Sequence, residues 1–252
     1  MSGHSKWAGI KHKKAITDAR KGAVFTKMAR EITVAAKEGG GDANGNFRLR
    51  LAIQRAREVN MPADNIERAI KRGTGEGGGA AIEELRYEGY GPGGVAILID
   101  VLTDNRNRTA SDIRNTFSRY GGNMADAGAV AWIFKRKGLI SADPAGKDPD
   151  ELALQVIELG AADVQVEDGH LEVETEPEDF ETVRDGMTQA GAKITHAEVT
   201  MSPSNTVPVT EEREAEKLLR LMDALEESDD VQQVYANFDI ATEQLERLSQ
   251  AV

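Results

Sequence analysis

The stretch "DVQVEDGHLEVET", residues 163–175, decides the fold of the acidic half of the chain. Its apolar residues alternate with polar ones on both sides of Asp168-Gly169, and such alternation predicts two strands joined by a tight turn. Further elements are expected on both sides of this hairpin. They are a strand over 138–143, a helix over 148–161, a helix over 176–191 and a strand over 193–203. The order β-α-β-β-α-β is typical of a ferredoxin-like unit.

The sequence before this unit predicts a second sheet that is incomplete on its own. Alternating β-formers on both sides of Gly91-Pro92-Gly93-Gly94 predict two strands joined by a turn. A helix follows, capped by Thr109 and Asp112. Residues 128–138 have the pattern of another strand. The end of the chain supplies a helix and then a strand, over 210–228 and 230–240. Neither could bury its apolar face alone. We therefore expect both to complete the earlier sheet, which makes the ferredoxin-like unit an insertion.

The first third of the chain predicts helices over 17–40, 46–60 and 61–75, followed by a Gly-rich linker over 73–81. When 17–40 is wound at about 100° per residue, its apolar and cationic residues separate onto opposite faces. The expected fold class is α+β with three domains. They are a basic helical domain over 1–78, a discontinuous α+β domain over 79–134 and 203–252, and an acidic ferredoxin-like domain over 135–202.

Charge is distributed very unevenly along the 252 residues, whose formal net charge is −12. Residues 1–72 carry 16 Lys and Arg against 7 Asp and Glu, residues 73–141 are balanced, and residues 142–252 carry 7 against 28. Such asymmetry indicates that the N-terminal end meets a polyanion that the acidic body avoids. The absence of cysteine excludes disulfides and thiolate chemistry, and fits a reducing compartment.

Nucleic acid is the polyanion that this pattern favours, because phosphate contacts require cations spaced along one surface. The alternative is an ordinary solvated helix face. Arg106 and Arg108 are expected in a loop before a helix N-terminus, a place suited to anions, although a capped solvated loop explains them equally well. The remaining candidate nucleic-acid-binding residues form a stripe that consists of Lys6, Lys11, His12, Lys13, Lys14, Arg20, Lys21, Lys27, Arg30 and Lys37.

Other functions find weaker support at the basic N-terminus. A zinc site needs three or four ligands, and besides His4 and His12 the chain has only two distant histidines. A membrane-surface helix needs a large apolar face, whereas only Trp7 and Ile10 are available. We expect Trp7 to anchor the segment on the helical domain, with base stacking as the alternative. The segment could also be a solvated tail.

Several motifs resemble those of the YebC/PmpR family, whose mitochondrial relatives are translational activators of cytochrome oxidase synthesis. They are "GHSKWAGIKHKKA", "DARKGAVFTKMAREI", "MPADNIERAIKRGTG", "YEGYGPGGVAILID", "LTDNRNRT", "GAVAWIF" and "DDVQQVYANFDI", and they extend over essentially the full chain. The resemblance implies three domains, no enzymatic activity and a DNA-binding transcriptional regulator. It also implies an alternative, a ribosome-associated translation factor that binds ribosomal or transfer RNA and relieves stalling at proline-rich stretches.

The sequence leads us to expect a non-enzymatic, cytoplasmic regulator that binds nucleic acid. We predict no catalytic residues, metal, cofactor, small-molecule substrate or membrane partner, since no stretch approaches the roughly 18 apolar residues of a membrane span and no acid–base pair stands out. A competing hypothesis is a protein–protein interaction module whose acidic sheets contact a basic partner. A hydrolase or nuclease would need an acid–base pair or a metal that we do not identify.

Overall fold

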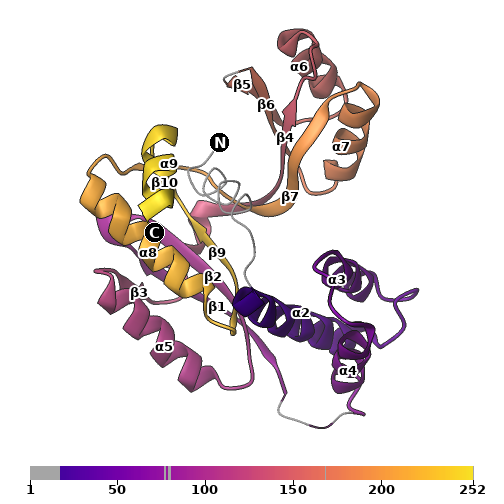
Figure 1. Cartoon of the computed structure of the whole chain (residues 1–252), viewed down its shortest axis with the longest axis vertical. Coiled ribbons are helices and arrows are strands. Elements are labelled where there is room, and N and C mark those ends of the chain that lie inside the picture. Colours follow the sequence, from indigo (N-terminus) through magenta and orange to yellow (C-terminus); the bar gives the residue numbers. More distant parts are fainter. Residues whose placement is uncertain (1–17, 77, 79–80, 168, 252) are drawn as a thin grey trace. The chain divides into compact units, whose positions relative to one another are not determined.

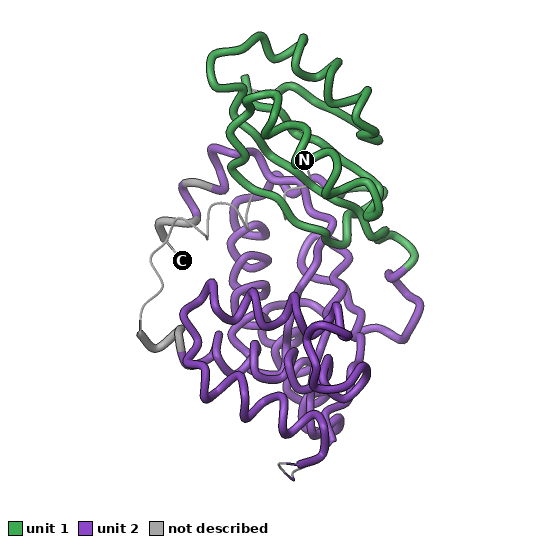
Figure 2. Tube along the Cα trace, turned by 90° about the vertical axis from the view of Figure 1, so that its right-hand side faces the viewer, with its two compact units in different colours: residues 1–9, 132–206 green, residues 10–131, 207–252 purple. Residues whose placement is uncertain are grey.

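The computed structural model describes residues 18–76, 78, 81–167 and 169–251. Among these, residues 132–206 form one compact unit, and residues 18–131 together with 207–251 form the other. Figure 1 follows the helices and strands along the chain, and Figure 2 colours the two units green and purple.

The unit of residues 132–206 has the ferredoxin-like topology expected from the sequence. Its antiparallel sheet has the order β5-β6-β4-β7, and the two helices contact each other and share one core with the sheet. The elements in chain order are β4 (Phe134–Asp143), α6 (Pro149–Glu158), β5 (Asp163–Glu167), β6 (His170–Thr175), α7 (Phe180–Gln189) and β7 (Lys193–Pro203). Asp148 caps α6 by accepting from the N–H groups of Asp150 and Glu151.

The other unit contains a four-stranded antiparallel sheet of order β3-β1-β2-β9. Its first three strands are β1 (Glu83–Tyr90), β2 (Ala96–Thr103) and β3 (Asn123–Ala125), and α5 (Arg106–Arg119) lies between β2 and β3 in the chain. The turn between β1 and β2 contains a short 3₁₀ segment, η1 (Pro92–Gly94), in which Gly93 and Gly94 have φ values of 72° and 74°. A side chain at either position would strain this turn.

The strand expected over 128–138 does not form as predicted. Residues 131–133 form a 3₁₀ segment, η2 (Ala131–Ile133), and β4 begins at Phe134 and belongs to the ferredoxin-like sheet. The physical reason is the buried carboxylate of Glu88, which accepts from the N–H groups of Gly128, Val130 and Ala131 at 2.6, 2.6 and 2.8 Å. These donors are therefore not available to a strand ladder.

The C-terminal segment completes the sheet, as expected from the sequence. Helix α8 (Glu212–Glu226) packs beside α5, and β9 (Val231–Ala236) pairs antiparallel with β2. Asn237 ends β9 and accepts from the N–H of Ala96 at 2.7 Å. Three elements were not anticipated, namely β3, β8 (Val207–Pro208) and α9 (Thr242–Ala251). The single strand expected over 230–240 is divided into β9 and β10 (Phe238–Asp239), and β10 pairs in parallel with β8.

Three helices precede this sheet, and their bounds agree with the expected ones. Helices α3 (Phe47–Glu58) and α4 (Ala63–Gly73) both pack on α2 (Asp18–Gly39). Their shared core contains the predicted apolar face of α2, with Ile32, Ala35 and Ala36 fully buried. The close approach of α4 depends on Gly73, because a Cβ there would stand 2.4 Å from the Thr33 carbonyl oxygen.

Candidate nucleic-acid interface

Cations of α2 make contacts within their own unit. Lys27 Nζ donates to the carbonyl oxygen of Glu226 at 2.5 Å, and Lys37 Nζ donates to the carbonyl oxygen of Ile82 at 3.4 Å. Both lysines belong to the predicted phosphate-binding stripe. The structure thus gives them intramolecular partners, and their contact with nucleic acid stays a prediction.

Arg30, also in that stripe, is part of a buried polar network centred on Asp230. Arg30 Nη1 and Arg108 Nη2 lie 2.5 and 2.9 Å from the Asp230 carboxylate oxygens, and Thr109 Oγ1 lies 2.5 Å from one of them. Burial raises the pKa of the Asp230 carboxyl, but hydrogen bonds from Thr109 and Arg108 and the charge of Arg30 outweigh it, so the pKa lies below its ordinary value. The network joins α2 to the first turn of α5.

The first turn of α5 holds both arginines that were expected in a loop. That expectation is wrong because the cap is Asn105, whose side-chain oxygen accepts from the Arg108 N–H at 3.1 Å, rather than Thr109. Arg108 is held by Asp230 and, at 3.0 Å, by Asp104. The Arg106 guanidinium is exposed and forms no ion pair with any described residue. The two neighbouring arginines therefore differ in their freedom to meet a ligand.

The most N-terminal candidates precede the first described residue, Asp18. Lys6, Lys11, His12, Lys13 and Lys14 lie outside the described residues, as does Trp7. The backbone of Arg20 and Lys21 belongs to α2, but their side chains are not among those described. The binding role of these residues stays a prediction.

Helices α3 and α4 carry exposed cations that our candidate set omitted. Arg48 and Arg55 form ion pairs with Glu38 and Glu31 at 2.6 and 3.0 Å. The others make no ion pair within the described parts of the chain, and they are Arg50, Arg57, Arg68, Lys71 and Arg72. Their positions, opposite the apolar face of α4 and beside that of α3, were visible in the sequence and could have indicated them.

An exposed aromatic ring stands among these cations. Phe47, the first residue of α3, is 64% exposed, and the Arg50 guanidinium carbon lies 5.3 Å from its ring centroid. Leu51, one turn further along α3, is also exposed. Cations beside an open aromatic face are typical of surfaces that bind single-stranded nucleic acid.

Two further findings concern other kinds of site. The described residues contain no group of three or more His, Cys, Asp or Glu side chains placed to hold a metal ion. Within the same part of the chain, no helix has both the length and the apolar character needed to cross a membrane.

Comparison with known proteins assigns the family. Fold and surface define a three-domain α+β protein whose N-terminal helices carry an excess of cations. Residues 5–76 match the model of the TACO1/YebC protein N-terminal domain, and residues 82–238 match that of the TACO1/YebC second and third domain. The chain belongs to the TACO1/YebC family.

Individual relatives cover nearly the whole chain. A protein of Dictyoglomus turgidum named "Probable transcriptional regulatory protein" is 57% identical over 250 residues, which span 99% of this chain and 100% of that protein. A protein of Halothermothrix orenii with the same name is 52% identical over 252 residues, again spanning 99% and 100%. The crystal structure of a conserved hypothetical protein from Aquifex aeolicus matches with a TM-score of 0.76 at 46% identity, covering 92% of this chain and 96% of that one.

Proposed function

We propose that this protein is a non-enzymatic regulator of gene expression that binds nucleic acid through its N-terminal helical domain. The observation that carries the proposal is the separation of charge. The helical third has a net charge of +9 in a chain of −12, and five exposed cations of α3 and α4 form no ion pair with any described residue, namely Arg50, Arg57, Arg68, Lys71 and Arg72. Cations on a compact helical surface bind phosphates by releasing condensed counterions.

The names of the relatives support a transcriptional role for this binding. We expect affinity to depend more on the phosphate backbone than on base sequence, because the exposed cations are spread over the surfaces of α3 and α4. Phe47 beside Arg50 favours a target with unpaired bases, which a ribosomal target would present.

The test compares two triple variants of the full chain. Lys11→Ala, Lys13→Ala and Lys14→Ala remove three charges from the N-terminal segment. Lys193→Ala, Arg213→Ala and Lys217→Ala remove three exposed charges from the acidic body and serve as the matched control. Binding to duplex DNA and to single-stranded RNA of equal length is measured by fluorescence anisotropy over a range of salt concentrations.

The first triple variant should bind more weakly, and the slope of log K against log salt should fall by about three units. The control variant should retain the wild-type slope. If wild type binds neither DNA nor RNA, or if both triple variants behave alike, the proposed function is wrong. Nucleic acid crosslinked in cells then identifies the process, since promoter DNA indicates transcription, and ribosomal or transfer RNA indicates translation.

A further inference from the structure

The outer surface of helix α5 is rich in side chains that can form hydrogen bonds. Thr109, Ile113 and Phe117 are buried and fix the side of the helix that faces the sheet. The opposite side carries four exposed uncharged polar residues at helical spacing, which we call the α5 outer stripe. They are Asn107, Ser111, Asn115 and Ser118.

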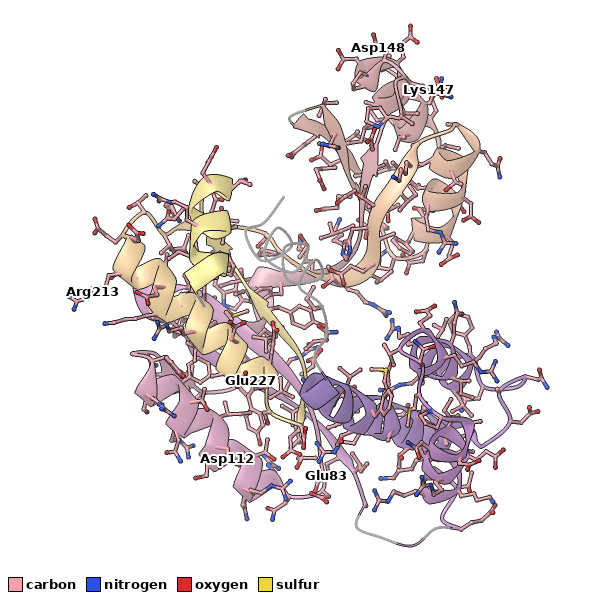
Figure 3. All side chains as sticks on the ribbon, in the orientation of Figure 1. Glu83, Asp112, Lys147, Asp148, Arg213 and Glu227 are labelled. Carbon is pink, nitrogen blue, oxygen red and sulfur yellow. The ribbon has the colours of Figure 1, made fainter. Side chains whose placement is uncertain are left out.

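Two arginines flank this stripe on one side. Arg106 and Arg114 are exposed, and their guanidinium groups form no ion pair with any residue that the structure describes. At about 100° per residue they are about 80° apart around the axis of α5, with Arg114 beside the stripe and Arg106, in the first turn, toward the side that holds Thr109 and Phe117. Asp112, the one acidic residue within α5, falls on the other flank with Arg108 and Arg119. Figure 3 shows side chains with blue nitrogen atoms projecting from α5 around the labelled Asp112.

Tyr87 of β1 lies next to Arg106. Its hydroxyl donates to the carbonyl oxygen of Arg106 at 3.4 Å. Burial raises the pKa of the Tyr87 phenol, while the charge of Arg106, a hydrogen bond with its side chain and the charge of Arg114 act in the opposite direction. Glu83 acts on the same phenol with the opposite sign.

At Tyr87, the edge of β1 that faces away from β2 has no strand paired with it among the described residues. Strand β3 pairs with β1 only at Glu88, Gly89 and Tyr90, so residues 83–87 pair with β2 alone among the described strands. A ligand lying along α5 can thus reach Tyr87 without displacing a strand. Arg108, by contrast, is held by Asp104 and Asp230 and orients the first turn.

We propose that the α5 outer stripe, with Arg106, Arg114 and Tyr87, is a second surface that binds the sugar–phosphate backbone of nucleic acid. Guanidinium groups bind phosphates bidentately, and Asn, Ser and Tyr side chains donate to phosphate and sugar oxygens. The inference rests on the proposed function and extends it, because it makes the protein a two-surface binder. Two linked contacts raise the overall affinity beyond that of either surface alone.

The test uses two double variants of the full chain that remove equal charge. Arg106→Gln with Arg114→Gln alters the proposed surface. Arg119→Gln with Arg213→Gln removes two exposed arginines outside it, one on the other flank of α5 and one on α8. Thermal unfolding confirms that both variants fold, and binding to duplex DNA and to single-stranded RNA is measured across salt concentrations.

The first double variant should lose roughly 5- to 20-fold in affinity at low salt and about two units of salt slope, and the second should stay near wild type. Glu83→Gln should change affinity in the opposite direction and bind about 2-fold more tightly, since it removes the opposing carboxylate. Loss with only DNA or only RNA identifies the backbone that α5 contacts.

Two failures are distinguishable. If wild type binds no nucleic acid, the proposed function fails and this inference fails with it. If wild type binds and the Lys11, Lys13 and Lys14 variant is impaired, but Arg106→Gln with Arg114→Gln binds like Arg119→Gln with Arg213→Gln, only the second surface is refuted.

Discussion

The Asp230 carboxylate lies 2.5 Å from the Arg30 guanidinium and connects it to Arg108 on another helix. Arg30 belongs to the N-terminal helices, whereas Asp230 comes directly before the last strand of the sheet. The pair therefore attaches the cationic helices to the sheet through one buried acidic group. Loss of the Asp230 carboxylate should therefore destabilise both the N-terminal helices and the sheet.

Replacing Asp230 with Asn should lower the free energy of unfolding by roughly 2 kcal/mol, because Arg30 loses its charged partner in a mostly buried place. Urea unfolding followed by circular dichroism measures this change. Asp229→Asn is the matched control, since Asp229 contributes its carbonyl oxygen to Arg30 and its side chain is exposed. Equal stability of the two variants would contradict the role of the carboxylate.

Stability should fall as the solution is acidified. The pKa values of Asp230 and Glu88 are lower than ordinary in the folded protein, so the folded state binds fewer protons than the unfolded state at these groups. Their contribution is present above the pKa values of the unfolded chain and is lost as pH falls through the folded ones. The double variant Asp230→Asn with Glu88→Gln should show a shallower loss between about pH 7 and about pH 3. An unchanged profile would assign acid sensitivity to other carboxylates.

Glu88→Gln should loosen the loop over residues 126–131. Burial raises the pKa of the Glu88 carboxyl, but the N–H groups of Gly128, Val130 and Ala131 more than offset it, and an amide cannot accept all three bonds. We expect a loss of about 2 kcal/mol and faster hydrogen exchange at these three amides. Glu84→Gln, which affects an exposed ion pair with Arg48, should change stability by less than about 0.5 kcal/mol.

Gly73→Ala should separate α4 from α2. The added Cβ would stand 2.4 Å from the Thr33 carbonyl oxygen and 2.7 Å from the Ala36 Cβ, and such overpacking costs about 1–3 kcal/mol. Gly22→Ala, inside α2 with no atom within 4 Å of the new Cβ, should instead stabilise by about 0.5–1 kcal/mol. Thermal unfolding of both variants tests the prediction, and a Gly73→Ala protein as stable as wild type would contradict it.

Local patterns predicted most of the fold. Alternation fixed the hairpin of β5 and β6, and the Gly-rich turn separated β1 from β2. The loop at 126–131 escaped prediction because its N–H groups bond to Glu88, about 40 residues earlier in the chain. Helix α9 was missed although Leu245 and Leu248, both buried, have helical spacing that could have indicated it.

The candidate interface was harder to predict than the fold. Charge patterning identified the cationic third of the chain, yet it could not separate cations with intramolecular partners from exposed ones. The partner of Lys27 lies 199 residues away, at Glu226, and no local spacing records such a contact. In the same way, Arg106 and Arg108 are equivalent in the sequence and differ only through Asp104 and Asp230.

The pairing of β2 with β9 has a consequence for synthesis of the protein. All four strands of the ferredoxin-like unit lie between residues 134 and 203, so that unit has its complete sheet before translation ends. The sheet of β1, β2 and β3 is completed only when residues 231–236 have been synthesised, after the whole inserted unit. A nascent or prematurely terminated chain would therefore expose the free edge of β2, a site for aggregation or chaperone binding, while its inserted unit is already folded.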